Sequence, residues 1–97
     1  MISYDYDKKC LEISEKSNGP DTEFRIRILS QDQDGQEAAQ ALKKIRYDFE
    51  RNDVLTDVLF YVHPNRDYQI IVRKDYYLDF MLSLFKYGLL SQISHNS

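Results

Sequence analysis

Residues 75–93 constrain the fold most, because a helix drawn through them is apolar around most of its circumference. One continuous core stripe follows the helical period and consists of Leu78, Met81, Leu82, Phe85, Leu89 and Ile93. A second apolar stripe lies beside it and consists of Tyr77, Phe80, Leu84 and Tyr87. Together the stripes cover roughly 240°, whereas a surface helix needs an apolar arc of only about 100°. We therefore expect this helix to have two partners.

The second stripe has two interpretations. In a two-layer fold, the helix can lie between the sheet and the other helix, which would bury both stripes within the chain. Alternatively, an exposed apolar patch that contains tyrosines is typical of a site for another protein chain. Gly88 weakens the helix, allows another backbone to approach closely, or ends the helix early. If the helix ends early, Leu89, Leu90 and Ile93 would form a hydrophobic extension that could reach a neighbouring subunit.

The composition describes one globular domain over residues 1–97. The 97 residues are 42% hydrophobic and 30% charged, which is ordinary for a single domain. A chain of this size buries one modest core, so a large substrate cleft is not expected. The formal net charge of −3 favours solubility. It argues against a protein that coats nucleic acid or anionic lipid, since both need a positive field.

The amino terminus and the single cysteine indicate a cytoplasmic protein. Residues 1–9 contain alternating tyrosines and aspartates where a signal peptide would need an apolar run. Cys10 alone cannot form an intramolecular disulfide. Residues 76–90 are too short for a membrane span, and Asp79 and Lys86 interrupt them. We expect no contact with a membrane.

The amino-terminal third predicts three strands. Apolar and polar residues alternate in residues 2–6 and again in 10–14, which predicts a first hairpin with its turn at 7–9. Residues 17–21 collect turn-forming residues and predict a loop. In residues 23–29, Phe24, Ile26 and Ile28 alternate with charged residues, which predicts a third strand with one face in water.

The remainder predicts a helix, a hairpin and the long helix. Asp34 begins the first helix in a capping-box arrangement with Glu37, and Asn52 and Asp53 end it. Its narrow apolar stripe consists of Ala38, Ala41, Leu42, Ile45 and Phe49. Residues 58–62 and 68–73 are rich in β-branched and aromatic residues and predict strands joined by a turn at 63–67. Residues 94–97 are polar and predict a frayed tail.

The element order ββ-β-α-ββ-α indicates an α+β fold. We expect an antiparallel sheet of about five strands with both helices on one face. If one amino-terminal strand takes the place of the last strand of a ferredoxin-like unit, the rest reproduces that layout in permuted form. This analogy between layouts has no functional weight.

The motifs of metal sites and catalytic sites are incomplete in this chain. Residues 32–35 read Asp-Gln-Asp-Gly, as in the middle of a calcium loop, but the first and twelfth ligand positions hold Ser30 and Ala41. These aspartates are better explained as the start of a helix. Cys10, His63 and His95 are too scattered for a zinc site or for a nucleophile pair. We predict no metal, no cofactor and no catalytic residue.

The open face of the sheet is the alternative site. Its candidate ligand-binding residues are Arg25, Arg27, Tyr61, His63 and Arg73. Cations and aromatic rings on one sheet face can bind an anionic ligand or stack single-stranded bases. Glu12, Asp5 and Glu23 would supply compensating charge on that face, so a solvated face with cross-strand ion pairs is the competing interpretation.

Taken together, these patterns predict a small, non-enzymatic protein that works by protein association through its last helix. The predicted partner-binding residues are Tyr77, Phe80, Leu84 and Tyr87. The expected partner is a second copy in a homodimer, or another protein for which the chain is a regulator or adaptor. Nucleic acid is not the expected partner.

Overall fold

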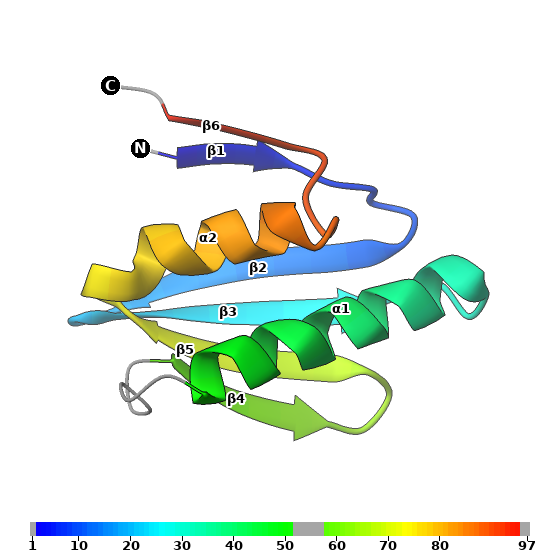
Figure 1. The fold of residues 1–97 in the computed structure, drawn as a ribbon, viewed down its shortest axis with the longest axis horizontal. Coiled ribbons are helices and arrows are strands. Elements are labelled where there is room, and N and C mark those ends of the chain that lie inside the picture. Colours follow the sequence, from blue (N-terminus) through cyan, green and yellow to red (C-terminus); the bar gives the residue numbers. More distant parts are fainter. Residues whose placement is uncertain (1, 52–57, 96–97) are drawn as a thin grey trace.

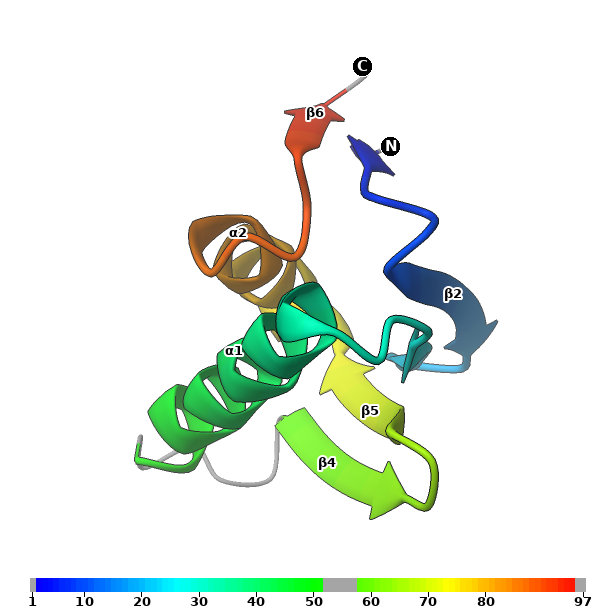
Figure 2. The same cartoon turned by 90° about the vertical axis from the view of Figure 1, so that its right-hand side faces the viewer.

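The computed structural model describes residues 2–51 and 58–95, and it is an α+β fold with two helices on one face of an antiparallel sheet (Figure 1). The four-stranded sheet has the order β2-β3-β5-β4, and a separate two-stranded sheet pairs β1 with β6. Figure 2 shows the two helices on the same side of the larger sheet. The elements are β1 (Ile2–Asp5), β2 (Leu11–Asn18), β3 (Asp21–Ile28), α1 (Gln33–Glu50), β4 (Val58–His63), β5 (Asp67–Arg73), a 3₁₀ turn (Lys74–Tyr76), α2 (Tyr77–Lys86) and β6 (Gln92–His95).

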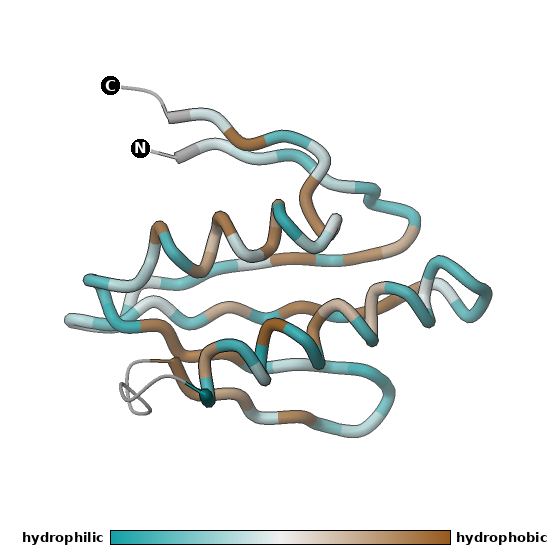
Figure 3. Tube along the Cα trace, in the orientation of Figure 1, coloured by the Kyte–Doolittle hydropathy of each residue, from teal (hydrophilic) through white to brown (hydrophobic). Residues whose placement is uncertain are grey.

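The core lies between the sheet and the helices. Phe80 on α2 is fully buried, and its ring centre lies 4.9 Å from that of Phe24 on β3 and 6.2 Å from that of Phe49 on α1. One side chain therefore joins α2 to both neighbours, and offset aromatic contacts at these distances are favourable. The predicted apolar stripe of α1 faces this core, with Phe49 partly buried. Figure 3 shows hydrophobic residues on both sides of α2, and only one of these sides can face the core.

The strands that alternation predicted are confirmed, but the first hairpin is wrong. β1 pairs with β6 rather than with β2, and β2 forms its hairpin with β3. The turn of that hairpin contains Gly19, whose φ of 63° suits a residue without a side chain. The predicted turn residues 7–9 instead form a local turn in which the Cys10 N–H donates to the Asp7 carbonyl at 3.0 Å.

The carboxyl terminus also differs from expectation. Ser94 and His95 belong to β6 instead of a frayed tail, whereas residues 96–97 lie outside the described residues. The long helix ends at Lys86, because Gly88 takes a φ of 83° and the Leu89 N–H bonds to the Leu84 carbonyl at 2.9 Å. A left-handed glycine with such a bond is a common helix ending.

The ends of the two helices also differ from those predicted, and two further expectations change as a result. Leu89 and Leu90 are 4% and 2% exposed and fold back into the core of their own chain, so an extension toward a neighbouring subunit is wrong for them. Helix α1 begins at Gln33 rather than at Asp34, because Asp32 is the N-cap and its carboxylate accepts the Asp34 N–H at 3.0 Å. The predicted helix stop at residues 52–53 lies outside the described residues.

The strand order agrees with the layout analogy in one respect. β2 lies beside β3 at one edge of the sheet, which is the place of the last strand of a ferredoxin-like unit in the permuted layout. The ribbon of β1 and β6 is additional to that layout and rises beyond β2, with the two chain ends close together (Figures 1 and 2).

Candidate functional site

The two apolar stripes of α2 are oriented largely opposite to the prediction, although Met81 of the predicted core stripe is fully buried as expected. Phe80 and Leu84, which were expected to contact a partner, are fully buried in the core. Leu78, Leu82 and Phe85, which were expected to form the core, are 52%, 47% and 45% exposed. Periodicity reports the width of an apolar arc but not the direction it faces, and here the sheet and α1 cover the aromatic side. The prediction that Phe80 and Leu84 form a surface is therefore wrong.

The two tyrosines at the ends of α2 are half-buried and bind other elements of the same chain. The Tyr77 hydroxyl donates to the Glu15 carboxylate on β2 at 2.9 Å. The Tyr87 hydroxyl donates to the Asp48 carboxylate on α1, and this hydrogen bond raises the pKa of Tyr87. Both side chains hold α2 against its neighbours, so their polar ends are already occupied within the monomer.

We call Leu78, Leu82 and Phe85 the exposed stripe. Their spacing of four and three residues places them in one line along α2. Asp79 and Lys86 are exposed and lie seven residues apart, hence on the same flank of that line. The exposed stripe is thus an apolar strip with one negative and one positive group along one border.

The open face of the four-stranded sheet gathers the alternative candidates as expected. The register places Arg25 beside Gln69 and Tyr61, and places Arg27 beside Asp67 and His63. Arg73 lies opposite Asp21 on the same face. All five candidates, Arg25, Arg27, Tyr61, His63 and Arg73, are exposed.

Carboxylates balance the cations of that face. Arg25 forms an ion pair with Asp67 at 2.6 Å, and Glu12 lies opposite Arg27. The side chain of Gln69 donates to Glu23 at 3.1 Å and lies 2.9 Å from the His63 ring. Of the acids expected there, Asp5 is absent because β1 belongs to the other sheet. Because a carboxylate lies beside each of the three arginines in the register, their charges are offset, and this face does not offer the strong positive field that binding of a polyanion needs.

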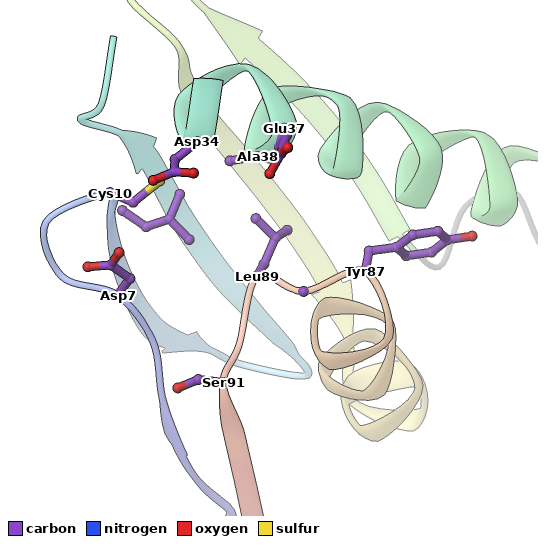
Figure 4. A pocket seen from close by; sticks show the side chains of 10 residues that line it. Asp7, Cys10, Asp34, Glu37, Ala38, Tyr87, Leu89 and Ser91 are labelled. Atoms are coloured by element: carbon purple, nitrogen blue, oxygen red, sulfur yellow. The ribbon is translucent and has the colours of Figure 1, made fainter. Parts of the chain in front are cut away.

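A cavity of about 340 Å³ lies where the 7–10 turn, the start of α1 and the α2–β6 connection meet (Figure 4). Asp7, Asp34 and Glu37 line it, and the Cys10 side chain lies beside Asp34. Burial, followed by the charges of Asp7, Asp34 and Asp32, raises the pKa of the Cys10 thiol. A protonated thiol is a poor nucleophile and a poor metal ligand.

The remaining candidate ligands do not converge on this cavity. His63 is at the end of β4, three strand spacings or roughly 14 Å from β2, so it does not approach Cys10. In the part of the chain that the structure describes, no three Cys, His, Asp or Glu side chains are placed to hold a metal ion. Asp32 serves as a helix cap, with hydrogen bonds from Ser30 and from helix amides that lower its pKa.

Sequence reasoning missed a groove between α1 and β4. It has a volume of about 370 Å³ and is lined by Ala39, Gln40, Leu42, Lys43, Arg46, Phe60, Val62 and Tyr68. Phe60 and Val62 lie two residues apart on β4 and therefore on one face of the sheet, but the gap between α1 and β4 depends on how the two elements pack. We call this feature the α1–β4 groove.

Comparison of the chain with models of protein families, with curated proteins and with solved structures finds no match. Among the described residues, neither helix has the length and apolar character needed to cross a membrane.

Proposed function

We propose that the protein acts by self-association, and that a second copy covers the exposed stripe of α2. The observation that carries this proposal is the line of three large apolar side chains, each about half exposed. Contiguous exposed apolar residues on a small protein are typical of sites for another chain. A symmetric dimer covers such a stripe economically, because each copy offers the same surface.

The charges beside the stripe favour an antiparallel pair of α2 helices. When two copies meet with a two-fold axis near Leu82, Asp79 of one copy lies opposite Lys86 of the second copy, and the reverse contact occurs by symmetry. A parallel pair would forgo these two contacts. Opposite charges at the rim of an interface favour one orientation over others, even where each pair adds little to the affinity.

Sedimentation equilibrium of the purified chain over a wide concentration range tests the proposal. We expect a dimer, and we expect Leu82→Glu to weaken association by at least about tenfold while the monomer stays folded. Leu59→Glu is the matched control, because Leu59 is an exposed leucine on the open sheet face. We expect its replacement to leave the dimer intact. Far-ultraviolet circular dichroism and urea midpoints confirm folding of each variant.

Exchange of the two border charges tests the orientation. Asp79→Lys alone should weaken the dimer, and adding Lys86→Asp to it should restore the dissociation constant. A wild-type chain that remains monomeric up to about 1 mM, or a Leu82→Glu variant that still dimerises, would sink the proposal. Leu84→Glu, by contrast, should unfold the monomer because Leu84 is fully buried. Cytoplasmic location, lack of catalysis and lack of nucleic-acid binding stay predictions.

A further inference from the structure

The two edge strands of the four-stranded sheet, β2 and β4, differ in how their outer backbone groups are protected. At the β2 edge, the Tyr6 hydroxyl accepts the N–H of Ile13 at 3.2 Å and donates to the carbonyl of Ile13 at 3.3 Å. One side chain thereby occupies both backbone groups that an added strand would need at that position. The β2 edge is therefore blocked against pairing where Tyr6 lies.

Among the described residues, nothing protects the β4 edge in a comparable way. In the order β2-β3-β5-β4, no described strand pairs with the outer side of β4. Residues 58–63 contain no lysine and no proline, and their register with β5 continues from Val58 to His63 without a bulge. Lysines, prolines and bulges normally keep edge strands from pairing with other chains. Since β4 has none of these, the outer side of β4 offers its backbone groups in a regular row that no described strand pairs with.

The α1–β4 groove opens beside this edge, because β4 is the outermost strand. Leu42, Phe60, Val62 and Tyr68 make its floor and wall apolar, and Val62 is 55% exposed. Alternate residues of a strand point to one face. Every second side chain of a strand added to β4 would therefore lie over this groove.

The helix side of the groove is basic in a chain whose formal net charge is −3. Arg46 forms an ion pair with Glu50 at 2.8 Å, whereas Lys43 makes no ion pair with any described residue. No acidic side chain is among the groove-lining residues. An occupant that brings carboxylates would meet Lys43 without displacing a partner.

We propose that the β4 edge and the α1–β4 groove bind an extended acidic peptide of a partner protein by strand addition. The peptide backbone pairs with β4, its apolar side chains cover Phe60 and Val62, and its carboxylates lie at Lys43. Backbone hydrogen bonds supply affinity in this mode, and the pockets for alternate side chains supply specificity. A second copy fits less well, because its own β4 carries no carboxylate to offer Lys43.

The test uses the whole chain labelled with ¹⁵N and a capped eight-residue peptide. The peptide has threonine at each odd position and valine and glutamate in turn at the even positions, so both types lie on one face of the strand. Two matched peptides replace each glutamate by lysine or carry N-methylated amides. We expect saturable amide shifts in β4 and α1 with the glutamate peptide only.

Charge variants provide the second arm. Lys43→Glu should weaken binding of the glutamate peptide roughly tenfold, because it replaces attraction by repulsion at the groove. Lys44→Glu makes the same charge change one residue along, outside the groove lining, and should leave the affinity unchanged. Both residues are exposed, so neither variant should unfold the chain.

Several results would overturn the proposal. These are no saturable shift up to about 1 mM peptide, equal binding of the lysine or N-methylated peptide, and equal weakening by Lys43→Glu and Lys44→Glu. Shifts confined to other elements would also overturn it. A concentration-dependent doubling of mass that Val62→Lys abolishes and Leu82→Glu does not would assign this edge to a second copy instead.

Discussion

Gly35 shows how a single residue can be explained by packing rather than by a ligand. In the sequence it completes an Asp-Gln-Asp-Gly run that resembles a calcium loop. In the structure it lies in the first turn of α1, and a Cβ atom there would lie 2.0 Å from the carbonyl oxygen of Ser30. Arg66 donates to that same oxygen at 3.2 Å and holds it in place. The glycine therefore allows the 29–32 connection between β3 and α1 to approach the helix.

Gly35→Ala should lower the free energy of unfolding by roughly 2 to 3 kcal/mol, because the backbone at Ser30 must move to make room. Urea denaturation followed by circular dichroism measures this change. Gly19→Ala is the control, since nothing lies within 4 Å of its added Cβ and its positive φ costs only about 1 kcal/mol. Equal losses in the two variants would contradict the packing explanation.

At the scale of elements, the sequence predicted those helices and strands that a local residue pattern determines. Alternation in residues 23–29 and 58–73 and the stripe from Ala38 to Phe49 each describe one face of one element, and the structure confirms these elements. The pairing of β1 with β6 joins opposite ends of the chain, so no local pattern reports it. The hairpin between β2 and β3 could have been found from the turn-forming residues at Gly19 and Pro20.

The candidate sites, too, were predictable where a local pattern determines them and not where they depend on how separate elements pack. The shared face of Arg25, Tyr61 and Arg73 was predictable, because a period of two assigns faces without knowledge of partners. The sequence could not show which stripe of α2 faces the core, because both stripes are strongly apolar and only the position of α1 and the sheet distinguishes them. The α1–β4 groove depends on the distance between two elements, and no residue pattern encodes that distance.

The ribbon of β1 and β6 should open far more readily than the central strands. Two strands alone are marginally stable, and this ribbon pairs with no strand of the larger sheet. Native-state amide hydrogen exchange should show much weaker protection in β1 and β6 than in β3 and β5, which have neighbours on both sides. Protection of the ribbon equal to that of β3 would mean that the two sheets unfold as one unit.

At the scale of the whole molecule, Glu15 connects three elements. Its two carboxylate oxygens accept hydrogen bonds from the hydroxyls of Tyr4 on β1, at 3.0 Å, and of Tyr77 at the start of α2, at 2.9 Å. Burial and then the neighbouring Glu15 raise the pKa of both tyrosines above the ordinary tyrosine value. The folded chain therefore keeps two protons that the unfolded chain loses in alkali.

Stability should consequently fall as the pH rises above about 10, the ordinary tyrosine pKa. In that range the unfolded state binds fewer protons than the folded state, so alkali favours unfolding; below it the contribution is fully present. Urea unfolding at a series of pH values from neutral to alkaline measures the slope. The Tyr4→Phe, Tyr77→Phe double variant should show a shallower decline, whereas Tyr47→Phe, at an exposed site, should not.

The unequal edges of the larger sheet also limit how copies of the molecule can assemble. A sheet with two bare edges can add copies at both ends and grow without limit, as in a fibril. Here Tyr6 occupies the β2 edge at Ile13, whereas no described strand pairs with the outer side of β4. Growth through this sheet is therefore obstructed at one end, because a strand that approaches the β2 edge of a further copy meets Tyr6 at Ile13.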